Sequence, residues 1–211
     1  MFSTISRNAY LLAAFAIACT GSIAIVNEFT QPIIDRQEQQ ALLKMLNQLI
    51  PAELYDNDIV ASCFRVTDKN LLGTAEPQQA FIAKKDNQPI ALMLKTTTMS
   101  GYSGKINLVV GIYADARIAG VRVLQHSETP GLGDKIQTNK SDWIYSFNDK
   151  FYQEAQKSRW DVKKNGGNFD AFTGATITPR AVVFAVKDAL IYFQENKKTL
   201  FKHEANCGES L

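Results

Sequence analysis

The sequence predicts an α+β protein with a single N-terminal transmembrane helix, followed outside the cytoplasm by a domain with a mostly antiparallel sheet. Three observations predict this fold: an uncharged apolar block near the N-terminus, strand-like segments in the middle of the chain, and helix-like segments at its ends. Strands and helices do not alternate in the way that a doubly wound parallel sheet requires.

The composition is that of an ordinary globular chain apart from the apolar block. The 211 residues include 23 Lys and Arg against 21 Asp and Glu, and 45% of the residues are hydrophobic. The near balance of charge argues against a nucleic-acid partner, and the hydrophobic content argues against a disordered or collagen-like chain.

A membrane anchor is predicted at residues 9–26. Residues 8–27 carry no charged side chain, and these 20 residues would form about 30 Å of helix, which matches one bilayer crossing. Arg7 precedes the block and Glu28 follows it. The positive-inside rule therefore places residues 1–8 in the cytoplasm and the rest of the chain outside it.

Two alternatives to a permanent anchor remain open. Residues 11–18 could be the core of a cleaved signal peptide, and Cys19 could be a lipoprotein site. The apolar character continues for seven residues beyond Cys19, to Val26, which favours the uncleaved anchor. In all three cases most of the chain leaves the cytoplasm.

The other two cysteines, Cys63 and Cys207, both lie in the exported part, where a disulfide can form and persist. One hypothesis is a bridge between them that ties the C-terminal tail to the domain. The alternative is two unrelated thiols, because the sequence does not give their separation in space.

A stalk helix is expected at residues 27–51, ahead of a domain at residues 52–211. Apolar side chains recur at helical spacing between Ile33 and Leu49, and Pro51 ends the pattern.

Strands are expected in three parts of the domain. Residues 59–66 are strand-like, and residues 81–94 and 106–123 each indicate two strands around a polar turn. Between and after these hairpins lie two loops that contain glycine, at residues 101–104 and 126–134. Glycine allows the chain to approach a ligand closely at such loops.

The clearest helix lies near the C-terminus. Thr178 is the expected N-cap, and Pro179 suits the first helical turn. The apolar stripe of this helix is expected to be buried, and it consists of Val182, Val183, Val186, Leu190 and Phe193.

Most catalytic motifs are absent from the sequence. It contains no P-loop, no complete G-x-G-x-x-G, no G-x-S-x-G and no C-x-x-C. His126 and His203 are the only two histidines, so we expect neither a histidine-based metal site nor a nucleophile activated by histidine. No catalytic residue is assigned.

Residues 170–180, with the sequence DAFTGATITPR, place small and hydroxyl-bearing side chains directly before the C-terminal helix. The first N–H groups of a helix lack partners and carry partial positive charge, so a phosphate fits there. Gly174 and Ala175 leave room for close approach, and Arg180 could add charge. Hydroxyls are available from Thr173, Thr176 and Thr178. A plainly capped helix is the alternative.

The stretch Asp170-x-x-Thr173-Gly174-Ala175-Thr176 matches the D-x-x-[ST]-G-A-T flavinylation motif of the FMN-binding domains in bacterial ion-pumping redox complexes. The loops at residues 101–104 and 128–133 resemble the other signatures of that family, in the same order. With the anchor, the resemblance spans nearly the whole chain and is closest to the G subunits of Rnf electron transport complexes. The C subunits of sodium-pumping quinone reductases, which are longer chains, are the alternative.

The resemblance implies an electron-transfer flavoprotein subunit, not catalytic alone, of a membrane complex that couples electron transfer to ion translocation. A flavin transferase would join FMN through its phosphate to Thr176, and Asp170 would serve recognition by that transferase. The other implied partners are further subunits of the complex. The implied location is the bacterial inner membrane, with a single pass and a periplasmic FMN-binding domain. Further candidate cofactor contacts are Tyr102, Ser103, Glu128, Thr129, Gly131, Leu132, Gly133, Thr173, Gly174 and Ala175.

A different class of protein also fits the residues before the C-terminal helix. It is a membrane-anchored extracytoplasmic module that binds or senses a small anion without covalent flavin. A secreted hydrolase has less support, because no nucleophile or carboxylate pair is evident.

Overall fold

The computed structural model of the protein describes residues 2–207. The chain divides into two units, with the boundary between Leu42 and Leu43. The first unit is helical throughout its described residues, and the second holds the sheet and all the other elements.

Helix α1 (Phe2–Leu49) runs without interruption through the expected junction between anchor and stalk, and it contains Pro32. Its segment Ser6–Ile34 is long and apolar enough to cross a membrane. The last turns of α1, from Leu43 onward, belong to the second unit. The expected boundaries of anchor, stalk and domain remain expectations.

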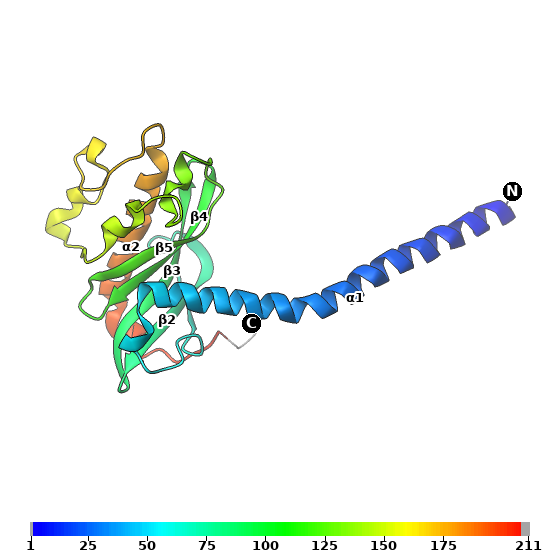
Figure 1. The fold of residues 1–211 in the computed structure, drawn as a ribbon, viewed down its shortest axis with the longest axis horizontal. Coiled ribbons are helices and arrows are strands. Elements are labelled where there is room, and N and C mark those ends of the chain that lie inside the picture. Colours follow the sequence, from blue (N-terminus) through cyan, green and yellow to red (C-terminus); the bar gives the residue numbers. More distant parts are fainter. Residues whose placement is uncertain (1, 208–211) are drawn as a thin grey trace. The chain divides into compact units, whose positions relative to one another are not determined.

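The second unit is built on a five-stranded antiparallel sheet in which each strand pairs with its neighbour in sequence, in the order β1-β2-β3-β4-β5 (Figure 1). The strands are β1 (Phe64–Asp68), β2 (Thr74–Lys85), β3 (Gln88–Gly101), β4 (Gly104–Tyr113) and β5 (Ile118–Gln125). The predicted α+β class with an antiparallel sheet is confirmed.

The two expected hairpins form, but the first has a tighter turn than the sequence suggested. Lys85 pairs with Gln88, so only Asp86 and Asn87 connect β2 to β3. Both connecting residues have positive φ, 50° and 61°. Asp and Asn tolerate this conformation, which two-residue hairpin turns with matching twist require.

The strand expected at residues 59–66 begins later, at Phe64. Residues before it form a turn, because the Asp58 carboxylate accepts hydrogen bonds from the amides of Val60 and Ala61, both at 3.0 Å. These local bonds hold the amides of the expected strand in a turn.

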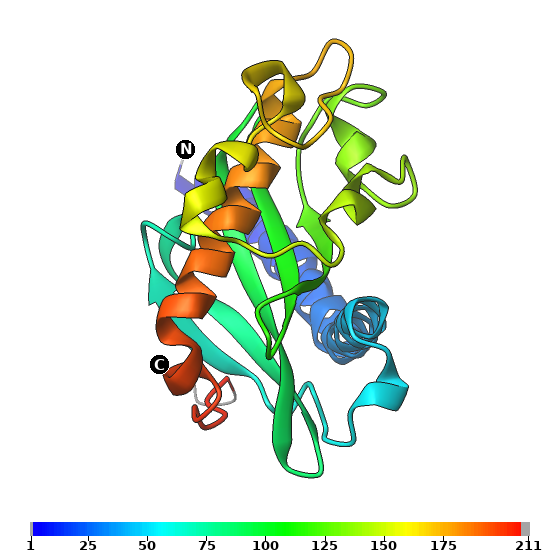
Figure 2. The same ribbon diagram turned by 90° about the vertical axis from the view of Figure 1, so that its left-hand side faces the viewer.

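Helix α2 (Ile177–Leu200) covers one face of the sheet and packs mainly on β3 and β4 (Figure 2). The five residues of its predicted stripe are all 0% exposed, as expected: Val182, Val183, Val186, Leu190 and Phe193. They meet alternate strand residues, such as Leu92, Leu94 and Leu108, in one hydrophobic core.

The last turns of α1 also pack within the second unit. Leu46, Leu49 and Ile50 are at most 2% exposed. The Arg122 guanidinium donates to the carbonyl and to the side-chain oxygen of Gln48, both at 3.2 Å. The segment before Pro51 is therefore part of the folded domain.

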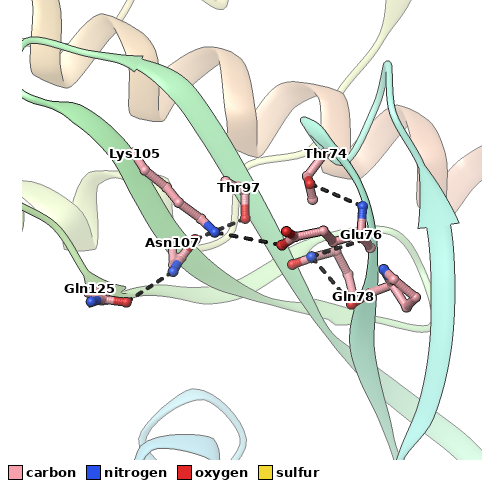
Figure 3. A network of polar contacts seen from close by, with 8 residues as sticks. Thr74, Glu76, Gln78, Thr97, Lys105, Asn107 and Gln125 are labelled. Carbon is pink, nitrogen blue, oxygen red and sulfur yellow. Dashed lines mark hydrogen bonds and ion pairs between the residues drawn. The ribbon is translucent and has the colours of Figure 1, made fainter. Parts of the chain in front are cut away.

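A polar network crosses the sheet away from these apolar contacts (Figure 3). The Thr97 hydroxyl donates to Asn107 Oδ1 at 3.0 Å, and Asn107 Nδ2 donates to Gln125 Oε1 at 3.3 Å. Lys105 and Glu76 form an ion pair at 3.8 Å. The network links β2, β3, β4 and β5 through side chains as well as through the backbone ladder.

A disulfide joins Cys63 to Cys207, which is one of the two alternatives that the sequence leaves open. The amides of Asn206 and Cys207 donate to the Cys63 carbonyl at 3.0 and 3.3 Å, and Asn206 Oδ1 accepts the Arg65 N–H at 2.9 Å. The C-terminal tail thereby satisfies backbone groups at the start of β1, an edge strand. An uncovered edge strand would offer such groups to another chain.

Replacing both Cys63 and Cys207 with Ser should lower the free energy of unfolding by about 2–4 kcal/mol, because the bridge closes a long loop and restricts the unfolded chain. Denaturant unfolding of the full-length protein in detergent, with and without the substitutions, measures the difference. Cys19→Ser is the control and should leave stability unchanged. Equal stability of the wild type and the double variant would show that the bridge contributes nothing.

Lys95→Met should raise the melting temperature at neutral pH. Burial lowers the pKa of Lys95 from its usual 10.5, so the fold disfavours the charged form. This penalty applies below the lowered pKa and disappears above 10.5, so the advantage of the variant should shrink as the pH rises toward that value. Melting curves at several pH values test this, with the exposed Lys164→Met as control. A pH-independent gain would contradict the prediction.

Candidate functional site

A cavity of about 310 Å³ lies beside the N-terminal end of α2. Three segments that are distant in sequence form its wall: the turn between β3 and β4, the loop after β5, and the residues that lead into α2. Its lining residues are Tyr102, Glu128, Thr129, Leu132, Gly133, Gly174, Ala175, Thr176, Ile177 and Thr178. Its volume lies within the range of small-molecule sites.

The residues that lead into α2 are held by contacts on both sides. Trp143 Nε1 donates to the Asp170 carbonyl at 2.7 Å, and the Asp170 carboxylate pairs with Lys163 at 2.7 Å. The Ala175 amide donates to the Phe172 carbonyl at 3.0 Å. Local turns and one aromatic side chain therefore fix the path of the chain to the cavity.

Helix α2 begins at Ile177, so the expectation that Thr178 is the N-cap is wrong. Thr176 occupies the N-cap position, and its side chain makes no capping hydrogen bond. Thr178 lies inside the first turn, where Pro179 is tolerated because the first helical amides need no partner within the helix. The Thr176 side chain lines the cavity instead of closing the helix end.

Glu128 connects the three walls of the cavity. It is 4% exposed, and its Oε1 accepts the Ser103 N–H at 2.9 Å. Its Oε2 accepts the hydroxyl proton of Thr178, which is itself 0% exposed. The Glu128 amide donates to His126 Nδ1 at 3.0 Å, so the imidazole is engaged in holding this loop.

Two glycines make room for this carboxylate. A Cβ atom on Gly101 would lie 2.7 Å from Glu128 Oε1, and one on Gly133 would lie 2.8 Å from Glu128 Oε2. Real Cβ atoms do not approach oxygen so closely. Close approach within the protein thus explains one glycine in each loop, Gly101 and Gly133.

Two cationic side chains next to the residues that lead into α2, Lys163 and Arg180, pair with carboxylates. Arg180, expected to add charge to the site, instead donates to both oxygens of Asp161 at 3.1 and 3.2 Å. Burial raises the pKa of Asp161, but hydrogen bonds from the Val162 amide and Arg180 outweigh it, so the pKa is lowered overall. Among the described residues that line the cavity, Glu128 is the only one with a charged side chain.

The structure brings together most of the residues that were expected to contact a cofactor. Eight of them line the cavity: Tyr102, Glu128, Thr129, Leu132, Gly133, Gly174, Ala175 and Thr176. Ser103, Gly131 and Thr173 are exposed and lie outside the lining, although Ser103 contributes its amide to Glu128.

The sequence reasoning missed Ile177, which lines the cavity and is 52% exposed. Thr178 was expected to be the N-cap of α2, whereas its hydroxyl donates to Glu128. An apolar residue directly after the last Thr of the motif is a weak signal, because the same residue type suits the buried side of a helix.

Comparisons with known proteins cover the whole chain. Residues 101–191 match the FMN-binding domain family, and residues 1–49 match the RnfG N-terminal region. The chain is 47% identical to the G subunit of the ion-translocating oxidoreductase complex of Shewanella loihica over 207 residues, 98% of each chain. It is 48% identical to the G subunit from Shewanella baltica, over 95% of each chain. For the G subunit from Pseudoalteromonas atlantica the identity is 46%, over all of this chain and 98% of the relative.

Gly133→Ala should destabilise the protein by about 1–3 kcal/mol, because the new Cβ would crowd both Glu128 and Thr178. Gly131→Ala is the matched control in the same loop: its Cβ meets no atom within 4 Å, but its φ of +77° is unfavourable for alanine. The control should therefore lose only about 1 kcal/mol. Denaturant unfolding in detergent compares the two. A smaller loss for Gly133→Ala than for Gly131→Ala would contradict the crowding.

Proposed function

Because the chain belongs to the family of G subunits of ion-translocating oxidoreductase complexes, we propose that its FMN-binding domain carries FMN joined by a phosphodiester to Thr176. In this role the protein is an electron-transfer subunit of a complex that couples electron flow to ion translocation. Thr176 is the last residue of the D-x-x-[ST]-G-A-T pattern and lines the cavity beside α2.

The observation that carries the proposal is the absence of a cationic side chain from the described lining of a cavity that Thr176 enters. A free FMN phosphate would meet only the partial positive charge of the α2 N-terminus, about +0.5 of an elementary charge. The buried Glu128 carboxylate opposes even that attraction. Such a site retains a phosphate poorly by ionic contact, whereas a covalent bond to Thr176 makes retention independent of affinity.

The rest of the lining suits a flat, mostly apolar group with polar edges. Tyr102 and Leu132 are exposed, 70% and 42%, and offer apolar surface at the cavity. Gly174 has no side chain and Ala175 has only a methyl group, so the cavity wall beside Thr176 leaves space for a bulky substituent on the Thr176 hydroxyl. When bound, FMN would supply the electron-accepting and electron-donating chemistry, and the protein would supply its position and its electrostatic environment.

The proposed location is the bacterial inner membrane, with α1 crossing once and the second unit in the periplasm. The apolar segment Ser6–Ile34 supports the crossing, and the Cys63–Cys207 disulfide supports an oxidising compartment. Residues 8–27 carry no charge that could serve ion passage, so the ion pathway belongs to partner subunits. A flavin transferase is the partner that completes maturation, and exposed Asp170 is the proposed recognition residue.

Thr176→Ala should abolish covalent flavin when the full-length protein is co-expressed with a flavin transferase, because the variant lacks the hydroxyl that receives the phosphate. The wild type should give a fluorescent band after denaturing electrophoresis, and peptide mass spectrometry should place FMN on Thr176. Thr173→Ala is the matched control three residues away and should keep the band. A wild-type chain without covalent flavin would favour the anion-binding module and overturn the proposal.

A further inference from the structure

Glu128 is a buried carboxylate in the wall of a cavity that is proposed to receive another anionic group. We propose that Glu128 is a positioning residue that fastens the first turn of α2 to the two loops opposite and thereby fixes Thr176 in the place where flavin is attached. This inference deepens the proposed function and rests on it.

The two carboxylate oxygens contact different elements. Oε1 accepts the Ser103 amide proton from the turn between β3 and β4, at 2.9 Å, and Oε2 accepts the Thr178 hydroxyl proton from α2. Glu128 itself lies in the loop after β5, whose own path is fixed by the bond from its amide to His126. One side chain therefore ties together three segments that no backbone ladder joins.

The connection to Thr176 is short. Thr178 is two residues further along the chain, in the first turn of the helix whose N-cap position Thr176 occupies. The Thr176 side chain makes no capping hydrogen bond that would hold it. Its place consequently depends on the backbone that Thr178 anchors, together with the bond between the Ala175 amide and the Phe172 carbonyl.

Glu128 is unsuited to binding the phosphate directly. A carboxylate and a phosphate repel each other, and each oxygen of Glu128 already accepts a hydrogen bond from the protein. Hydrogen bonds to a buried charged acceptor are among the stronger ones in proteins, which suits a structural clamp.

One glycine in each loop, Gly101 and Gly133, fits the same clamp. Gly101 and Gly133 each bring a backbone without a Cβ atom against one of the two Glu128 oxygens. The clamp therefore explains why glycine occupies positions 101 and 133, where any larger residue would crowd Glu128. It assigns Gly101 and Gly133 to the support of the acceptor site.

The test compares variants of the full-length, unflavinylated protein in detergent. Glu128→Ala removes the clamp, and Glu128→Gln keeps an acceptor for Ser103 and a polar group for Thr178. Thr178→Val removes the hydroxyl that donates to Glu128 with little change of side-chain shape, so it replaces Glu128→Ala in the test if that variant fails to fold. Thr178→Ser keeps the hydroxyl and is the conservative variant. Thr97→Val is the matched control, because it removes a hydrogen bond of another buried threonine, whose side-chain partner in the network of Figure 3 is Asn107 and not Glu128.

Two measurements are made on each variant. Amide hydrogen exchange follows Ser103 and Ala175, whose N–H groups are bonded in the site. Steady-state flavin transfer, with FAD and a flavin transferase, gives kcat and the KM for this protein. In this reaction the pyrophosphate bond of FAD breaks, the FMN group is joined through its phosphate to the Thr176 oxygen, and AMP leaves with the hydroxyl proton. A misplaced acceptor lowers kcat, whereas the KM changes little because Asp170 and its neighbours remain available for recognition.

For Glu128→Ala and Thr178→Val we expect exchange at both amides to accelerate about tenfold or more, as for the loss of a hydrogen bond to a charged group. The kcat of flavin transfer should fall by a similar factor. Glu128→Gln and Thr178→Ser should recover most of both quantities, and Thr97→Val should change neither. Wild-type exchange in Glu128→Ala, or an equal effect of Thr97→Val, would overturn the inference.

The two proposals fail in different ways. If the wild-type chain accepts no flavin, the proposed function fails, whereas the exchange measurements still show whether Glu128 orders the segment around Thr176. If the wild type accepts flavin and Glu128→Ala accepts it at the same kcat, only the positioning role fails.

Discussion

Burial of the apolar stripe of α2 against the sheet is the interaction on which the rest of the second unit depends. Its five stripe residues are fully buried, and each would contribute about 1.5–3 kcal/mol relative to an exposed position. This packing holds α2, whose N-cap position is occupied by Thr176, against the sheet. The cavity forms where the N-terminal end of this helix meets two loops, the turn between β3 and β4 and the loop after β5.

The charges around the cavity form a consistent arrangement. Asp161 forms an ion pair with Arg180, and Asp170 forms one with Lys163, so both of these cations are paired with carboxylates. The charges left at the cavity are the partial positive charge of the α2 N-terminus and the buried Glu128 carboxylate, which accepts hydrogen bonds from Ser103 and Thr178. A site of this kind is organised around a hydroxyl group and leaves little to ionic attraction, which is consistent with a group held by a bond.

The features that the sequence predicts well are those set by neighbouring residues. Alternating apolar residues and short polar turns predict both hairpins, and the stripe from Val182 to Phe193 predicts α2 and its buried face. The start of β1 was predicted too early because the Asp58 carboxylate accepts hydrogen bonds from the amides of Val60 and Ala61, which the pattern assigned to a strand. Thr178 was misassigned because its partner, Glu128, lies 50 residues away and only the tertiary fold brings the two together.

The order of the strands has a consequence for how the protein matures. Every strand pairs with its neighbour in sequence, so each hairpin can form as soon as its second strand is available. Among the described elements, helix α2 follows all the strands, and it supplies one wall of the cavity. Until α2 packs on the sheet, the apolar face of the sheet is uncovered and the pocket lacks one wall, so any loading of the pocket requires α2 to be in place.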